Sequence, residues 1–180
     1  YTTEAERAGY SSALMMPPVV FENIHAHLYW DAPLASDSSA YPVLLFSPGL
    51  GSPIRFYTSL LTELASQGYV VVVVDHPYSQ TVSLFPDETV VTVNMAGSDM
   101  QTAEKRDAIL GVWVDDMRYA LDYVAELNES DPVLAGAFDL ENVGALGHSF
   151  GGAASANLSL VDDRVAASIN MDGSVFGEAG

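Results

Sequence analysis

The segment Asn142–Ala154, NVGALGHSFGGAA, constrains the fold of this chain more than any other stretch. An apolar run leads into Gly147–Gly151, which matches G-x-S-x-G, and small residues follow it. Between a strand and a helix, this pattern holds its serine on a sharp, strained turn, and bulk at either glycine would clash with neighbouring elements. The segment therefore predicts a nucleophile, Ser149, in preference to a plain glycine-rich turn.

The rest of the chain alternates between apolar strand patterns and helical patterns. Such alternation predicts an α/β fold with a mostly parallel sheet and helices on both faces. The expected strands are Val20–Trp30 (alternating, half-buried), Tyr41–Phe46, Tyr69–Asp75 (buried on both faces), Asn142–His148 and Arg164–Asp172, and the expected helices are Ile54–Gln67, Gln101–Leu127 and Phe150–Leu160. Residues 76–100 have no clear period and are expected to form a long excursion with a short hairpin around Thr89–Met95; excursions of this length are often functional.

Composition limits the function classes. The chain has 180 residues, enough for one domain spanning 1–180, and 24 acidic against 6 basic residues give a net charge of -18. That charge argues against nucleic-acid binding and favours a secreted or an acid- or salt-tolerant protein. There is no cysteine and no apolar run long enough to cross a bilayer. Sequons at Asn128 and Asn157 would permit glycosylation in a eukaryotic secretory pathway, although burial of Asn157 in its helix would prevent it.

An acyl-transfer serine needs hydrogen-bond donors for an oxyanion. The backbone N–H of Phe150, at the start of the helix, is one candidate. The glycine-rich loop SPGLGSP follows a neighbouring strand, and we expect its Leu50 N–H to be the second, although the loop also fits a simple turn. Asp172 ends the next strand, where this architecture places functional groups, so it is the candidate triad acid; Asp75, at another strand end, competes with it.

Four segments carry a resemblance to a known family: LLFSPGLGS, GYVVVVVDHPYS, GHSFGGAA and NMDGSVFG. Together they span about Tyr41 to Gly177 and resemble α/β-hydrolases of the platelet-activating-factor acetylhydrolase type, which include secreted fungal and bacterial esterases and lipases. The resemblance implies an α/β-hydrolase fold and a serine esterase. It also implies the roles of four residues: Ser149 as nucleophile, Asp172 as triad acid, and the Leu50 and Phe150 amides as oxyanion donors.

One residue departs from the family pattern. The family usually has His-Gly before the oxyanion leucine, whereas this chain has Pro48-Gly49. Because the donors are backbone groups, we expect the oxyanion hole to persist with a different set of supporting hydrogen bonds.

None of the four histidines suits the role of catalytic base. His148 directly precedes the serine and should point away from it, and His25 and His27 alternate on an early strand, where a polar face is a better interpretation than a metal site. His76 follows a strand end and is a weak candidate. In α/β-hydrolases the order is serine, acid, histidine, and only eight residues follow Asp172. We therefore expect the C-terminal part of the fold to be missing from this chain, with a further segment or second chain supplying the histidine and a strand beside Arg164–Asp172.

The sequence thus predicts a hydrolase of small-molecule or lipid esters, with Tyr78 and Phe85 of the excursion in the substrate pocket and with no cofactor or metal. Two alternatives remain open. The chain could be a non-catalytic binding module of the same fold, since it lacks the histidine. It could also be a serine amidase or peptidase that uses the same triad.

Overall fold

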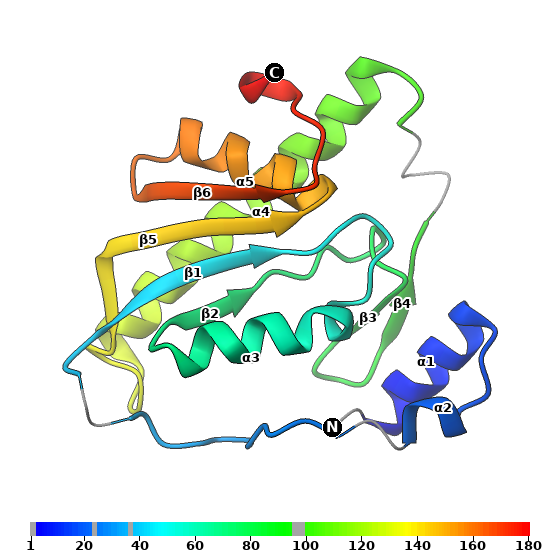
Figure 1. The fold of residues 1–180 in the computed structure, drawn as a ribbon, viewed down its shortest axis with the longest axis horizontal. Helices are drawn as coiled ribbons and strands as arrows, with labels where there is room; N and C mark the ends of the chain where they lie inside the picture. Colours follow the sequence, from blue (N-terminus) through cyan, green and yellow to red (C-terminus); the bar gives the residue numbers. More distant parts are fainter. Residues whose placement is uncertain (1–2, 23–24, 36–37, 95–99) are drawn as a thin grey trace.

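The computed structural model describes residues 3–22, 25–35, 38–94 and 100–180. Its centre is a parallel sheet with the strand order β2-β1-β5-β6, and β3 and β4 form a separate antiparallel hairpin (Figure 1). The strands are β1 Tyr41–Ser47, β2 Val70–Val73, β3 Val82–Leu84, β4 Val90–Thr92, β5 Phe138–His148 and β6 Val165–Met171. The helices are α1 Glu4–Leu14, α2 Val19–Glu22, α3 Thr58–Ser66, α4 Ala103–Ser130 and α5 Phe150–Val161, with the short 3-10 helices η1 Ile54–Tyr57 and η2 Gly177–Ala179.

Helices cover both faces of the sheet, as the alternating pattern predicted. Figure 1 shows α3 on one face and the packed pair α4 and α5 on the other. The apolar stripe of α4 is buried against the sheet and α5 through Leu110, Trp113, Val114, Met117, Leu121 and Val124. The small residues at the start of α5 are buried too, which lets that helix approach β5 and β6 closely.

The two edge strands, β2 and β6, are only partly covered. The expectation that Tyr69–Asp75 is buried on both faces is wrong, because β2 is shorter, lies at one edge and is only half-buried. β6 forms the other edge, and Ile169 is 60% exposed. No strand among the described residues pairs with the outer side of β6, so they do not provide the expected neighbour of Arg164–Asp172.

The predicted strand Val20–Trp30 is wrong. Val19–Glu22 form the short helix α2, and residues 25–30, the remaining described part of the segment, carry no strand. Leu28 is 47% exposed and Trp30 81% exposed, so the apolar side of the alternating pattern is not buried. Ile24 lies outside the described residues. A period of two assigns side chains to two faces, but a strand also needs a partner for its backbone groups, and this segment has none in the part of the chain that the structure describes.

The excursion does contain a hairpin, in which β3 pairs with β4, but only β4 lies in the expected segment Thr89–Met95, of which Met95 is outside the described residues. Helix α1, which the sequence pattern did not reveal, packs against both strands. Glu6 of α1 is buried and accepts two hydrogen bonds from Arg55 of η1, at 2.6 and 3.0 Å. This ion pair fastens the N-terminal helix to the segment that follows the SPGLGSP loop.

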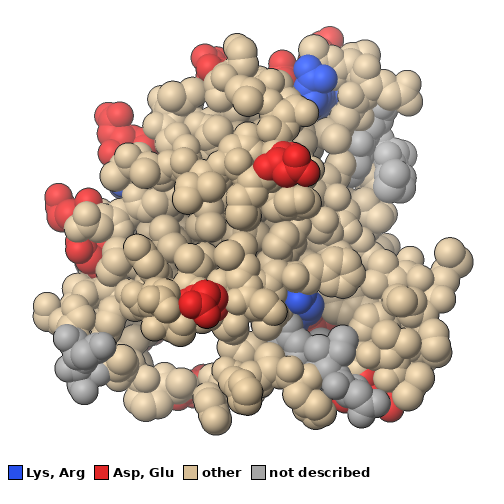
Figure 2. Space-filling model, in the orientation of Figure 1, with Lys and Arg blue, Asp and Glu red and all other residues tan. Residues whose placement is uncertain are grey.

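The surface reflects the acidic composition. Figure 2 shows acidic side chains dispersed over one face of the molecule, with few basic side chains among them. Among the described residues, no helix combines the length and the apolar character needed to cross a membrane.

Candidate active site

Ser149 sits on the turn that the sequence predicted. It is the N-cap of α5, directly after β5, and its backbone angles are φ 53° and ψ −120°. Positive φ in a residue with a side chain costs roughly 1–3 kcal/mol and is found mainly where the surrounding structure enforces it, often at functional sites. A methyl group on Gly147 would overlap the backbone of Gly151, and one on Gly151 would overlap the backbone of Ser47 and Pro48. The glycines of the motif are therefore required by close packing of backbone on backbone.

The predicted oxyanion loop lies beside this serine. A Cβ placed on Gly49 would be 3.3 Å from Cβ of Ser149. Leu50 follows Gly49, and its N–H has no acceptor among the described residues. Phe150 is the first residue of α5, where backbone N–H groups have no partner within the helix and carry the positive end of its dipole. Both predicted donors therefore belong to segments that flank Ser149.

Asp172 directly follows β6, the strand next to β5, and its side chain is exposed. The Ser149 N–H donates to the Met171 carbonyl oxygen at 2.8 Å, which joins the turn to the residue before Asp172. Asn170 braces the same turn: its Oδ1 accepts from Gly173 N–H at 2.8 Å, and its Nδ2 donates to the Gly173 carbonyl at 3.1 Å. Asp172 has φ 59°, so this bracing holds it in a left-handed conformation near the serine.

Asp75, the competing acid, lies farther away. It follows β2, which is separated from β5 by β1. Burial raises the pKa of Asp75 above its ordinary value, with the nearby Ser83 hydroxyl and His76 opposing that shift. Its position, on the far side of β1 from β5, therefore favours Asp172 over Asp75 as the triad acid.

His76 belongs to a second serine–histidine–aspartate arrangement, which the sequence reasoning missed. Its Nε2 lies 3.0 Å from Ser47 Oγ, and its Nδ1 lies 2.7 Å from Asp116 Oδ2. These distances are those of a catalytic triad, but Ser47 is 0% exposed and His76 1% exposed, and the imidazole stacks on Trp113 at 3.9 Å. A substrate cannot reach this serine in the folded chain, so the arrangement supports the end of β1 and the excursion.

None of the four histidines forms a hydrogen bond to Ser149 within the described residues. His148 points away, as predicted, and its Nδ1 lies 2.8 Å from the Tyr57 hydroxyl. His27 lines a groove beside α3, and His25 lies on the same segment. No group of three or more histidine, aspartate or glutamate side chains in the described part of the chain could hold a metal ion.

The two predicted substrate residues occupy different parts of the excursion. Tyr78 is 58% exposed and directly precedes Ser79, whose carbonyl accepts from Gly51 N–H at 2.8 Å. Tyr78 is thereby held close to the oxyanion loop. Phe85 is 39% exposed and lies at the turn of the β3–β4 hairpin, with no described contact to that loop.

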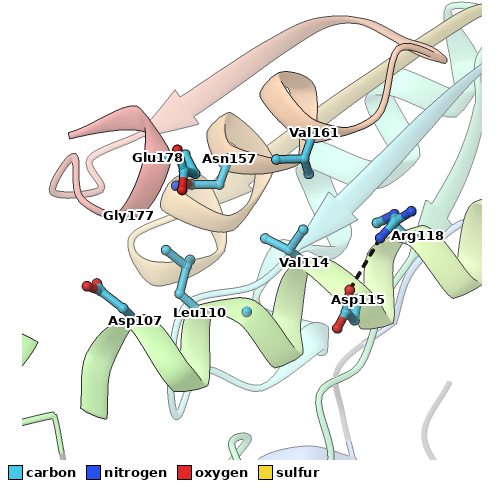
Figure 3. Close-up of a pocket in the computed structure, with 10 residues that line it drawn as sticks. Asp107, Leu110, Val114, Asp115, Arg118, Asn157, Val161, Gly177 and Glu178 are labelled. Atoms are coloured by element: carbon cyan, nitrogen blue, oxygen red, sulfur yellow. Dashed lines mark ion pairs between the residues drawn. The ribbon is translucent and has the colours of Figure 1, made fainter. Parts of the chain in front are cut away.

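A separate groove lies away from Ser149. It has a volume of about 510 Å³ and is lined by α4, α5 and η2, as Figure 3 shows. Leu110 and Val114 of α4 point toward Val161 and Asn157 of α5, and Ser149 does not line it. Its acidic and apolar lining offers no nucleophile, so we assign the candidate site to the surroundings of Ser149 instead.

Both asparagines of the sequons use their side-chain amides. Asn157 is 4% exposed and donates to the carbonyls of Ala153 and Phe176. Asn128 exchanges two hydrogen bonds with the backbone of Phe138. A glycan at either nitrogen would disrupt these contacts in the folded chain.

Sequence comparison decides the family. The profile described as "Platelet-activating factor acetylhydrolase, isoform II" matches residues 5–177. The chain belongs to this family. A fungal relative from Arthroderma benhamiae, "Probable 1-alkyl-2-acetylglycerophosphocholine esterase", is 33% identical over 143 residues, which are 79% of this chain and 34% of the relative. "Platelet-activating factor acetylhydrolase" of Cavia porcellus is 26% identical over 95% of this chain and 44% of its own length.

Comparison with solved structures points to a related fold. A ferulic acid esterase from Streptomyces cinnamoneus superposes with a TM-score of 0.66 and 32% sequence identity, covering 77% of this chain and 38% of that protein. The predicted α/β-hydrolase fold is thereby confirmed. The chain spans between about a third and less than half of the length of these relatives.

Proposed function

We propose that this member of the acetylhydrolase family is a serine carboxylic-ester hydrolase that works through an acyl-enzyme, with Ser149 as its nucleophile. The observation that carries the proposal is the strained conformation of Ser149 at the start of α5, beside the Gly49–Leu50 loop. The names of the relatives, which are esterases and acetylhydrolases, support the same reaction class.

The proposed reaction uses this geometry directly. A base takes the proton from Ser149 Oγ as the oxygen attacks the ester carbonyl carbon. The carbonyl oxygen becomes an oxyanion, which accepts hydrogen bonds from the N–H groups of Leu50 and Phe150. The protonated base then gives its proton to the departing alcohol, which leaves an acyl group on Ser149 Oγ. A water molecule, deprotonated by the same base, attacks this acyl-enzyme, and the base returns the proton to Ser149 Oγ as the carboxylic acid leaves. Asp172 stabilises the positive charge on the base.

The base in this proposal is a histidine outside residues 1–180. None of the four histidines hydrogen-bonds Ser149 within the described residues, and the outer edge of β6 pairs with no described strand, which leaves a place for an additional one. We expect the new imidazole within about 2.6–3.2 Å of Ser149 Oγ, or somewhat farther without ligand, with its other nitrogen toward Asp172. A structure of the protein as its source produces it tests this; β6 remaining an open edge there would contradict it.

The substrate class we propose is a small-molecule or lipid ester. Tyr78 would contact the substrate because its side chain is exposed and the next residue, Ser79, is hydrogen-bonded to the oxyanion loop, and Phe85 would do so if the hairpin turn reaches the acyl or alcohol part. Secretion is also a prediction, based on the acidic composition. Finding the protein in the culture medium of its source, or only inside the cells, would decide that point.

The decisive experiment compares the natural protein with its Ser149→Ala variant. We expect the variant to lose labelling by a fluorophosphonate probe and to lose hydrolysis of a short p-nitrophenyl ester by several orders of magnitude, while its unfolding curve stays close to that of the natural protein. Near-normal turnover by the variant would show that the nucleophile is elsewhere. A natural protein that reacts with neither compound would instead be a binding module, and faster cleavage of the matched amide would make it an amidase.

A further inference from the structure

Tyr57 connects the two halves of the proposed catalytic site. Its hydroxyl oxygen accepts a hydrogen bond from Gly49 N–H at 3.1 Å and lies 2.8 Å from Nδ1 of His148. Gly49 directly precedes Leu50, the proposed oxyanion donor, and His148 directly precedes Ser149. A single hydroxyl group is therefore one residue away from both the donor and the nucleophile.

The chemistry of the groups fixes the direction of one of these bonds. A backbone N–H can only donate, so the Tyr57 oxygen accepts at Gly49. A phenol oxygen can also donate its proton or accept a second one, so the contact with Nδ1 of His148 is compatible with either neutral tautomer of the imidazole. In both cases one oxygen atom holds Gly49 and His148 together.

The position of the Tyr57 ring is set by regular structure. Tyr57 ends η1 and is the N-cap residue of α3. Its ring packs on Phe46, a fully buried residue of β1, with centroids 4.8 Å apart and an interplanar angle of 57°. The hydroxyl is thus held by α3 and the central sheet, which makes it a fixed reference point for the glycine-rich loop beside it.

Little space remains between the linked segments. A Cβ on Gly49 would lie 2.9 Å from Nδ1 of His148, closer than real Cβ contacts. The backbone of the oxyanion loop therefore passes directly against the residue that precedes Ser149. A change of about 1 Å in this spacing is large for an oxyanion donor, whose benefit depends on distances of 2.7–3.1 Å.

We propose that Tyr57 is a positioning residue for the esterase reaction: its hydroxyl sets the distance between the Leu50 N–H and Ser149. This inference rests on the proposed function, but it goes further, because it assigns the support of the oxyanion loop to a side chain outside the G-x-S-x-G motif. In this chain proline precedes Gly49 in the oxyanion loop, and the hydrogen bond from Gly49 N–H to the Tyr57 hydroxyl holds that loop in place.

Tyr57→Phe tests the proposal in the natural protein because it keeps the ring and removes one oxygen atom. Complete loss of an oxyanion donor costs about 100- to 1,000-fold in kcat. Loosening the loop without deleting the donor should cost less, roughly 10- to 100-fold in kcat, with KM changed by no more than about threefold. The affinity of a trifluoromethyl ketone, which forms a tetrahedral adduct, should fall by the same factor as kcat/KM.

Tyr41→Phe is the matched control. Tyr41 begins β1, at the end of the strand opposite the site, and its hydroxyl donates to the Ala35 carbonyl at 2.6 Å. The same atom is removed from a tyrosine at the other end of β1, so kcat should remain within about twofold of the natural value. Unfolding curves of both variants show whether either has lost stability.

The possible results separate the two levels of the argument. If Ser149→Ala abolishes turnover while Tyr57→Phe keeps natural kcat and ketone affinity, the positioning role is wrong and the proposed function stands. If Tyr57→Phe lowers only the stability, and kcat of the folded fraction is unchanged, Tyr57 is a packing residue and the inference is also wrong. If Ser149→Ala remains active, the proposed function itself fails.

Discussion

Ser47→Ala is the most informative perturbation, because Ser47–His76–Asp116 has the hydrogen-bond pattern of a catalytic triad yet lies in the interior. Ser47 Oγ is 3.0 Å from Nε2 of His76, and neither side chain is more than 1% exposed. Removing the hydroxyl leaves a buried imidazole nitrogen without a partner, which costs roughly 1–3 kcal/mol. Because only one oxygen atom is lost, the added cavity contributes little to that cost.

The expected change in thermal unfolding follows from this free energy. For an unfolding unit of 150–250 residues, 1 kcal/mol corresponds to a shift of about 2–4 °C, so the midpoint should fall by roughly 2–12 °C, and by less in a longer unit. Labelling of the folded protein by a fluorophosphonate should proceed at close to its natural rate, because the proposed nucleophile is Ser149. Ser66→Ala on α3 is the control, since its hydroxyl bonds only to the Glu63 carbonyl at the surface and its removal should change stability by less than about 0.5 kcal/mol.

The opposite pattern would refute this reasoning. If Ser47→Ala kept the natural midpoint and lost labelling, Ser47 would be the nucleophile and the buried arrangement would have to open to substrate. A loss of labelling that only parallels the unfolded fraction would not have that meaning, so labelling is measured at least about 10 °C below the lower midpoint.

Two further substitutions test the aspartates. Asp172→Asn should lower kcat by about four orders of magnitude, as expected for a triad acid, while Asp75→Asn should change it far less; steady-state ester hydrolysis measures both, and a larger loss for Asp75→Asn would exchange their roles. Asp75→Asn should also stabilise the protein at neutral pH, because burial raises the pKa of Asp75 and the ionised carboxylate is unfavourable in the folded state. In the natural protein, the contribution of Asp75 to stability is present at low pH and is lost as pH rises through the raised pKa. The difference in free energy of unfolding between Asp75→Asn and the natural protein should therefore shrink on acidification. Urea unfolding between about pH 4 and pH 8 measures this difference, and a value that does not change with pH would contradict the reasoning.

The sequence predicted the parts of the site that depend on local backbone chemistry. The apolar run, glycines and small residues around Ser149 allow only one close packing of β5 on α5, so the turn could be inferred directly. The parts that depend on long-range contacts could not. Tyr57 and His148 are 91 residues apart, and His76 and Asp116 are 40 apart, and no local pattern announces either pair. The contact between Asn170 and Gly173 is different because it is local: N-x-x-G at the end of a strand indicates a turn, so this contact could have been predicted from the sequence.

The strand errors have one physical cause. Valine-rich Tyr69–Asp75 and the alternating segment Val20–Trp30 both have suitable side chains for strands, but side-chain pattern does not specify which backbone groups will be paired. The first became a half-buried edge strand, and the second found no partner among the described residues. Pairing depends on the whole sheet, so it lies beyond what a single segment can reveal.

The geometry around Ser149 also restricts the direction from which a base can approach. On the β1 side, Gly49 lies against the Cβ of Ser149, and Tyr57 with His148 fills the space behind it. On the β6 side, the Ser149 N–H is tied to Met171, and the next residue, Asp172, is exposed. A base that contacts both Ser149 Oγ and the Asp172 carboxylate must therefore enter over the end of β6. The hydrogen bonds that fix the oxyanion loop and those that fix the acid thus lie on opposite sides of the nucleophile, leaving between them the position that the proposed histidine has to occupy.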